Sequence, residues 1–440
     1  MPRNTLRFVS VLTAVILAGT SAISQDAIRL VERFDPADAY RVEVKVTISG
    51  TVSVPLEKDK PPRELAVRGM GTVVFDERPL AADRVLRLYR ELSLRRSVGE
   101  REQSAEIRPT VTRMVVLRSD AGKKAPFSPD GPLTWNEIDV VRADLFAPAL
   151  VPGLLPAKPV RPGDQWPATT VAVTELTDLD PIQEGGLTVG FPSVVTLDGR
   201  RYAKLTVTGS VKGVSEDGPV TQRLDGISYF DLDGNRLTYL NLSGTKDLLG
   251  PDGKSAGRIE GKFVMSRKPA GRVPELTDSA LRDRDLEPTP ENTHLLYDNT
   301  ALGVRFLYSR RWRVGTVQGR QVTLDEPKGG GILVSLEPLE SLPTADQFLT
   351  ETRDFLTKQK WSVTGTDAPR RWQERPAIVD RFALDAEVNR ESVRLEYAVI
   401  RQTDGGATVA ARLPIAQRKD LEPDVDRLLK SLTITKRIGK

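Results

Sequence analysis

Residues 40–48 read YRVEVKVTI, in which apolar side chains alternate with charged or hydroxyl-bearing ones. Successive side chains of a β-strand point to opposite faces, so this alternation predicts a strand with one buried and one solvated face. Segments of similar character follow near 64–75, 84–95, 106–118, 166–176, 201–212, 226–232, 236–243 and 258–266. Turn pairs typical of hairpins lie among them: Asp198-Gly199, Asp217-Gly218 and Asp233-Gly234. We therefore expect residues 26–267 to form a mainly β N-terminal domain with an antiparallel, strongly curved sheet or half-barrel.

One inserted helix is expected to interrupt these strands. Thr134 and Glu137 have the spacing of a capping box, and apolar residues then recur on one helical face, namely Ile138, Val141 and Leu145. Pro148 should lie beyond the end of this helix. The proline-rich passage 152–167 is interpreted as an ordered crossover between two β halves, with Trp166 opening the next strand.

The second half of the chain has a different character. Residues 268–290 combine several prolines with alternating charges, which is typical of a linker. Residues 291–436 then mix strand and helix patterns, so we expect an α+β C-terminal domain. Its strands fit 303–308, 320–325, 331–337, 376–385, 391–402 and 406–413.

Two helices are expected in this C-terminal domain. The first fits 345–360, where Thr344 and Gln347 form a capping box and the buried stripe is Phe348, Leu349, Phe355 and Leu356. The second should begin near Pro423 and turn its apolar residues inward, namely Val425, Leu428, Leu429 and Leu432.

The N-terminus has the features of a secretory signal peptide over residues 1–24. Arg3 and Arg7 precede an apolar run too short to span a bilayer, and Ala22-Ile23-Ser24 fits the small residues before a cleavage site. The chain has no cysteine, which excludes disulfides, thiolate catalysis, Cys-based metal sites and the acylated cysteine of a lipoprotein anchor. We expect an exported protein, periplasmic or extracellular, with no membrane span in the mature chain.

The charge balance gives no electrostatic case for nucleic acid, because 64 Lys and Arg face 60 Asp and Glu. The densest basic stretch, Arg90 to Arg101, also contains acidic and apolar residues. We interpret it as the solvated face of a strand.

No residue pattern predicts a catalytic or metal site. His294 is the single histidine, and no Gly-x-Ser-x-Gly motif accompanies it, so we expect a surface or domain-edge role. Asp231-Leu232-Asp233-Gly234-Asn235 resembles a calcium loop, but its glycine comes too early, and a hairpin turn explains it better. Gly329-Gly330-Gly331 precedes a strand pattern and not a helix, which favours a hairpin tip over a phosphate loop.

The remaining candidates are carboxylates and tryptophans. The pairs Asp178/Asp180 and Asp424/Asp426 are weak as ligand sets, and the second pair fits the first turn of a helix. The five tryptophans are scattered and are expected in the core or at its edge: Trp135, Trp166, Trp312, Trp361 and Trp372. We therefore assign no catalytic residue, no metal ligand and no cofactor, and the ligand-binding residues stay unknown.

The C-terminal part resembles the PsbP-like superfamily. The resemblance follows Gly303-Val304-Arg305-Phe306, Trp312, the helix 345–360 with Trp361-Ser362-Val363 after it, and the ending Leu429-Lys430-Ser431-Leu432. It implies a compact α/β/α sandwich, in a superfamily whose members are mostly non-enzymatic accessory or interaction modules. It carries over no functional residue.

The N-terminal part is similar to exported proteins of unknown function that are common in planctomycete-type bacteria. The shared pattern is Leu133-Thr134-Trp135-Asn136-Glu137, then Leu155-Pro156-Ala157-Lys158-Pro159-Val160, then Gly163-Asp164-Gln165-Trp166. This resemblance implies no activity. The architecture is also similar to the half-barrels of periplasmic lipid and lipoprotein carriers, which is a likeness of shape alone.

The leading hypothesis is a non-catalytic, exported binding or envelope-associated protein. Its β domain would hold a lipid-like apolar ligand, or a partner protein's surface, and its C-terminal sandwich would be a second interaction module. One alternative is a hydrolase of envelope polymer that uses two carboxylates. Another is a purely structural scaffold. An apolar hollow on the concave side of the sheet would favour the carrier, and a filled core would favour the scaffold.

Overall fold

The computed structural model describes residues 26–33, 35–54, 61–81, 83–118, 124–142, 150–215, 218–250, 253–374, 377–388 and 391–439. The expected signal peptide, the turn residue Asp217 and the end of the expected helix at Leu145 lie outside these residues. The described part is mainly antiparallel β, with a β-rich N-terminal domain and an α+β C-terminal part, as the sequence predicts. None of its helices is both long and apolar enough to cross a lipid bilayer.

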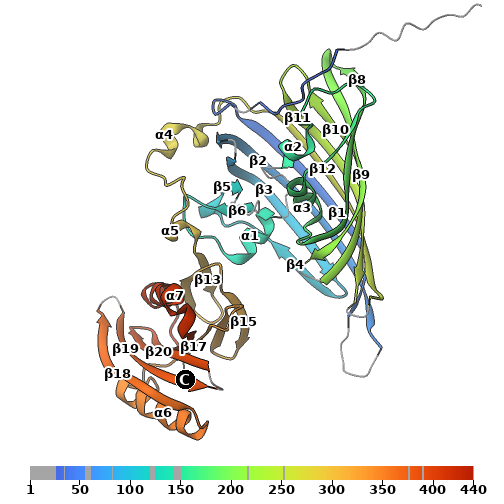
Figure 1. Cartoon of the computed structure of the whole chain (residues 1–440). Helices are drawn as coiled ribbons and strands as arrows, with labels where there is room; N and C mark the ends of the chain where they lie inside the picture. Colours follow the sequence, from blue (N-terminus) through green and yellow to red (C-terminus); the bar gives the residue numbers. More distant parts are fainter. Residues whose placement is uncertain are drawn as a thin grey trace, which may run out of the picture.

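The N-terminal domain is built on one strongly curved sheet (Figure 1). The strand order is β6-β5-β3-β2-β1-β12-β11-β10-β9-β8-β7, and β4 also pairs with β3. Every pairing between these named strands is antiparallel, and the β1–β12 pair joins the two halves of the sheet. The strands are β1 (Tyr40–Val54), β2 (Arg63–Ala81), β3 (Arg84–Val98), β4 (Arg101–Ala105), β5 (Arg113–Arg118), β6 (Lys124–Phe127), β7 (Gln165–Pro167), β8 (Ile182–Leu197), β9 (Arg200–Ser215), β10 (Gly218–Asp231), β11 (Arg236–Leu249) and β12 (Ser255–Pro269).

The hairpin turns explain the register of this sheet. Asp198 and Gly199 both have positive φ, which is the conformation that a two-residue turn between β8 and β9 requires. Between β10 and β11, the Asp231 carboxylate accepts hydrogen bonds from the backbone N–H groups of Asp233 and Gly234. The second turn confirms the hairpin interpretation of the calcium-like stretch.

Short helices occupy part of the hollow of the sheet. Helices α2 (Leu150–Leu154) and α3 (Thr170–Thr177) lie inside the curve, and α1 (Trp135–Arg142) lies near β4 and β6 (Figure 1). The core between helices and sheet includes Leu154, Ala172, Val173 and Leu176 from the helices. The expected helix near 134 is confirmed, with Thr134 and Glu137 forming the capping box.

The prediction of a strand over 166–176 was wrong. Strand β7 ends at Pro167, and Thr169 then caps α3 by accepting a hydrogen bond from Ala172 N. The β-branched residues Val171 and Val173 favour a strand locally. The apolar face shared by Ala172, Val173 and Leu176 has helical spacing, and its burial against the sheet decides the outcome.

The segment 268–290 lies against the outer face of the sheet. It contains a 3-10 turn (Pro274–Leu276) and α4 (Asp278–Leu281), and it leads into α5 (Pro290–Thr293). Val273, Leu276 and Leu281 pack on a second apolar cluster formed by Leu86, Leu88, Val115 and Phe127. Arg90 reaches from β3 to Glu275 (2.8 Å). These contacts fix the path of the chain between the two domains.

The C-terminal domain has a seven-stranded and a three-stranded antiparallel sheet, in the orders β15-β16-β17-β21-β20-β19-β18 and β13-β14-β22. Helix α6 (Ala345–Lys358) packs on one face of the larger sheet, and α7 (Arg418–Ser431) packs on the other, which makes an α/β/α sandwich. The strands are β13 (Leu295–Asn299), β14 (Val304–Tyr308), β15 (Arg313–Gln318), β16 (Gln321–Asp325), β17 (Gly331–Glu337), β18 (Ser362–Gln373), β19 (Ile378–Val388), β20 (Glu391–Gln402), β21 (Gly405–Pro414) and β22 (Thr433–Ile434).

Two details of the helices differ from the predictions. Helix α7 begins at Arg418 and contains Pro423, because Leu421 is buried and Arg418 pairs with Glu422 one turn later. Asp424 and Asp426 are therefore in the middle of the helix and not in its first turn. In α6, Leu349 and Leu356 are buried as expected, but Phe355 is 55% exposed.

The two domains contact each other through the segment before α1. Leu296 N donates to Leu133 O (2.8 Å), and Arg310 Nη2 donates to Pro126 O (2.6 Å). The guanidinium of Arg313 lies 3.9 Å from the centre of the Trp135 ring. Helix α1 is thus held to the N-terminal domain by the ion pair of Glu137 with Arg108 (2.8 Å) and to the C-terminal domain by the contact of Trp135 with Arg313.

Candidate functional site

A hollow of about 970 Å³ lies on the concave side of the N-terminal sheet. We call it the trough. It is bounded by β1, β2, β3, β4, β11 and the end of β9, by α1, and by Asp178 after α3. Its apolar lining includes Val46, Ile48, Leu94 and Val140. Pockets for small ligands in proteins have volumes of roughly 300–1,000 Å³, so the trough has room for one such molecule.

The burial along β1 shows where the cover of the concave face ends. Val42 and Val44 are completely buried, whereas Val46 and Ile48, which point to the same side, are partly exposed. Helices α2 and α3 cover the first part of the face, and the trough is the part that they leave open. The concave face therefore leaves Val46, Ile48 and Leu94 partly exposed in the floor of the trough.

Glycines give the floor its depth. Gly69 and Gly261 are the register partners of Ile48 on its two sides. A Cβ on Gly69 would lie only 2.6 Å from Cγ1 of Ile48, so the Ile48 side chain lies across this glycine. A Cβ on Gly261 would lie 3.6 Å from Cγ2 of Ile48, an ordinary contact distance. The space beside Ile48 over β12 belongs to an adjoining hollow of about 580 Å³, which is lined by Ile48, Gly244 and Gly261 and is open because the two glycines have no side chains.

Cationic side chains flank this floor. By register, Arg96, Arg101 and Lys246 point to the same face as Ile48, and all three line the trough. Arg96 donates a hydrogen bond to Gln103 (3.0 Å). Within the part of the chain that the structure describes, no carboxylate forms an ion pair with any of the three. The acids at the trough are Asp139, Asp178 and Glu102, and Glu102 points by register to the outer face.

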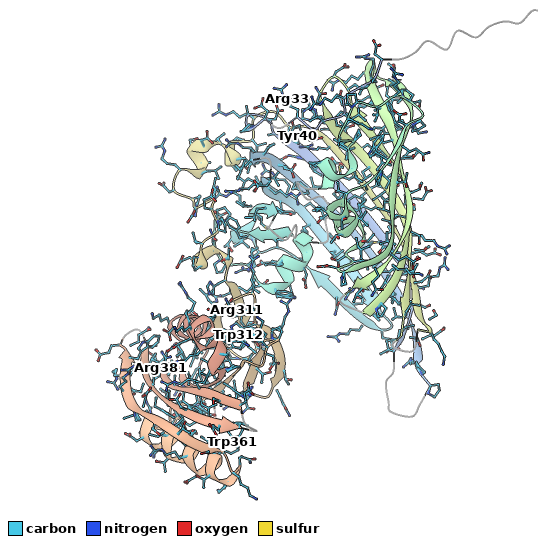
Figure 2. All side chains as sticks on the ribbon, viewed as in Figure 1. Arg33, Tyr40, Arg311, Trp312, Trp361 and Arg381 are labelled. Carbon is cyan, nitrogen blue, oxygen red and sulfur yellow. The ribbon has the colours of Figure 1, made fainter. Side chains whose placement is uncertain are left out.

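A buried ion network lies at the covered end of the same face. Arg267 binds Glu32 and lies 3.5 Å from Glu77, which also binds Arg87 (3.0 Å). Burial acts to lower the pKa of Arg267, but the charges of Glu32 and Glu77 outweigh it and raise that pKa above its usual value. Glu32 also accepts from Leu237 N (2.9 Å). The network fixes the segment before β1 onto β11 and β12, close to Tyr40, which Figure 2 labels.

This network brings two carboxylates together, which sequence patterns did not predict. Both carboxylates pair with guanidinium groups; Glu77 is almost fully removed from solvent, and Glu32 is partly buried. Among the described residues, no group of three or more His, Asp or Glu side chains is placed to hold a metal ion.

Of the residues singled out from the sequence, Asp178 lines the trough, as do Arg96 and Arg101 of the basic stretch, whereas His294, the triple glycine and the tryptophans do not. His294 follows α5, is partly exposed, and its ring contacts Pro290 O. Gly329 to Gly331 form the turn between β16 and β17, as expected. Trp312 is fully buried, and the other four tryptophans are partly buried: Trp135, Trp166, Trp361 and Trp372.

No protein-family model matches this chain, and no curated protein sequence matches it. Among solved structures, it is similar to the PsbP protein of the cyanobacterium Synechocystis sp. PCC 6803, at 14% identity and a TM-score of 0.27, over 32% of this chain and 92% of that one. A variant of the protein Mog1 is 10% identical with a TM-score of 0.26, and the match covers 32% of this chain and 96% of the Mog1 chain. Lipovitellin, from a study of its lipid–protein interactions, is 9% identical with a TM-score of 0.31, and the match covers 55% of this chain and 26% of lipovitellin. Likeness at this level is weak, and it assigns no ligand to the trough.

Proposed function

We propose that this chain is a non-catalytic, exported binding protein that holds a lipid-like molecule in the trough. The observation that carries the proposal is the floor around Val46, Ile48 and Leu94, which is apolar, concave and partly exposed. The protein would act in the cell envelope, in the periplasm or outside the cell.

The energetics of the floor support a bound apolar molecule. Burying apolar surface contributes about 25 cal/mol per Å², so a chain laid along the floor gains affinity from every side chain that it covers. Strands β1, β2, β12 and β11 are rigid central strands, each paired on both sides. The floor is therefore preformed, and a ligand loses little free energy in ordering it.

The C-terminal sandwich supports this role through α1. Arg313 stacks on Trp135, while Asn136, Asp139 and Val140 of the same helix line the trough. We propose that the C-terminal domain is an interaction module that also holds this wall in place.

The full chain is first extracted with organic solvent and refolded. It is then titrated with N-phenyl-1-naphthylamine, an uncharged fluorescent probe of apolar sites. Saturable binding is expected. Ile48→Glu puts a charge on the floor and should weaken binding at least about tenfold, since each tenfold costs 1.4 kcal/mol and an unpaired carboxylate against an apolar ligand costs more. Thr47→Glu is the matched control, because residue 47 is exposed on the opposite face of the same strand. Equal binding by both variants would contradict the proposal.

A further inference from the structure

The polar side chains of the trough are arranged in order along it. Register pairing defines rows of concave-facing residues that cross the sheet, with successive rows about 7 Å apart along each strand. The row through Val46 holds only apolar residues and glycine: Leu94, Gly71, Val46, Phe263 and Leu242. The next row, through Ile48, begins with Gln103 on β4 and Arg96 on β3 and continues with Gly69, Ile48, Gly261 and Gly244.

The third row, through Gly50, has a cation at each end. It runs from Arg101 on β4 through Val98, Val67, Gly50 and Ile259 to Lys246 on β11. Because the sheet is curved, Arg101 and Lys246 belong to opposite walls of one hollow, and both line it. The floor of the trough is thus apolar in the row through Val46, and two rows further along the strands it has a cation on each wall.

The acids at the trough do not neutralise this end by direct contact. Asp139 belongs to α1 and Asp178 follows α3, so both lie on the side that faces the sheet, and Glu102 points outward. None of the three forms an ion pair with Arg96, Arg101 or Lys246 in the described part of the chain. Two guanidinium groups and one ammonium are therefore available to an anion that enters between the walls.

We propose, on the basis of the function proposed above, that the occupant of the trough is a monomeric acidic phospholipid. Its acyl chains lie on the floor around Val46 and Ile48, and its phosphate lies between Arg96 and Arg101 on one wall and Lys246 on the other. Guanidinium groups suit phosphate because their paired N–H donors match two of its oxygens. The apolar floor distinguishes this ligand from free phosphate, and the cations distinguish it from a neutral lipid.

The test compares three probes by calorimetry on the solvent-extracted, refolded full chain at low salt. They are dioctanoyl phosphatidylglycerol, dioctanoyl phosphatidylcholine and inorganic phosphate. The acidic lipid should bind at least about tenfold more tightly than the zwitterionic one, because both carry the phosphate but the quaternary ammonium of choline brings a like charge against the three cations. Inorganic phosphate alone should bind too weakly to detect.

The variants separate the two proposals. Arg96→Gln/Arg101→Gln/Lys246→Gln should abolish the preference for phosphatidylglycerol and weaken phosphatidylcholine binding far less, because the loss of phosphate contacts is offset by the loss of repulsion against the choline ammonium. The control, Arg68→Gln/Arg223→Gln/Lys262→Gln, removes the same charges from the outer face of the same sheet and should behave as wild type. Equal affinity of the wild type for both lipids, or phosphate binding as tight as lipid binding, would overturn this inference while the proposed function stands. If neither lipid, nor phosphate, nor the uncharged naphthylamine binds the protein, both the proposed function and this inference are contradicted.

Discussion

Ile48 and Gly261 are register partners in the central strands β1 and β12, and a Cβ placed on Gly261 would lie 3.6 Å from Cγ2 of Ile48. A side chain can therefore be added at residue 261 without disturbing the sheet, and it would enter the concave space beside Ile48.

Gly261→Phe should weaken naphthylamine binding at least about tenfold and leave the free energy of unfolding within about 1 kcal/mol of wild type, because the added ring occupies open space. The control is Gly186→Phe on β8, where a Cβ would meet no atom within 4 Å and the residue is exposed. Fluorescence titration and urea unfolding measure the two quantities. Undiminished binding by Gly261→Phe would show that the ligand lies elsewhere.

The capping box of α1 predicts a pH dependence. Burial alone would raise the pKa of Glu137, but hydrogen bonds from the Arg108 side chain and from the N–H groups of Thr134 and Arg108 outweigh it and hold that pKa below 4.5. The folded state therefore binds this proton less readily than the unfolded chain. The stabilisation is present above about pH 4.5 and is lost as the pH falls through the lowered pKa.

Glu137→Gln should accordingly cost about 2 kcal/mol at pH 7, and the difference from wild type should shrink below pH 4.5. Urea unfolding over a series of pH values measures it. Glu100→Gln, an exposed residue between β3 and β4, should show no such difference. A constant gap between Glu137→Gln and wild type at every pH would contradict the assignment.

Trp312 ties the first strands of the C-terminal domain to α7. The indole is fully buried, and its Nε1 donates to Asp424 Oδ2 (2.9 Å), beside Arg311 (Figure 2). Trp312→Phe should lower the free energy of unfolding by about 2–4 kcal/mol, because it leaves a small cavity and removes a partner from a buried carboxylate. Trp361→Phe, at a partly exposed ring, should cost less than about 1 kcal/mol. Equal losses in the two variants would contradict this role.

Arg310 connects the two domains. It donates to Thr293 O (2.7 Å) and Pro126 O (2.6 Å), and burial lowers its pKa to about 10. Arg310→Met removes both hydrogen bonds and should cost about 2 kcal/mol, so that the domains unfold less cooperatively in a thermal scan. Arg320→Met, at the exposed turn between β15 and β16, is the control. A single transition unchanged from wild type would show that Arg310 does not couple the domains.

Much of the fold follows from local patterns in the sequence. Alternation along 40–48 predicts β1 with the correct buried face, and the turn chemistry of Asp198-Gly199 and Asp233-Gly234 places two hairpins. Strand β8 was not predicted, because its glycines and Pro192 interrupt the alternation of apolar and polar residues. Strand β18 was not predicted either, because it is an edge strand with little buried surface and hence no alternation to detect.

The trough could not be predicted, because it depends on register between strands far apart in the sequence. Nothing local indicates that Gly261 lies beside Ile48, or that Lys246 lies across from Arg101. The stretch from Arg90 to Arg101 was correctly interpreted as largely exposed, yet only pairing with β2 and β4 shows that Arg96 and Arg101 face the trough. Likewise, the contacts of Arg90 with Asp76 and Glu275 require the folded path of residues 268–290.

A lipid-like molecule held on the concave face should stay with the protein through purification. The most direct measurement is mass spectrometry of an organic-solvent extract of the protein purified from its native host without detergent, with Ile48→Glu and Thr47→Glu prepared in parallel. We expect a phospholipid in near-equal molar amount with wild type and Thr47→Glu, and its loss from Ile48→Glu. Extracts without lipid, or the same lipid from all three proteins, would contradict the proposal.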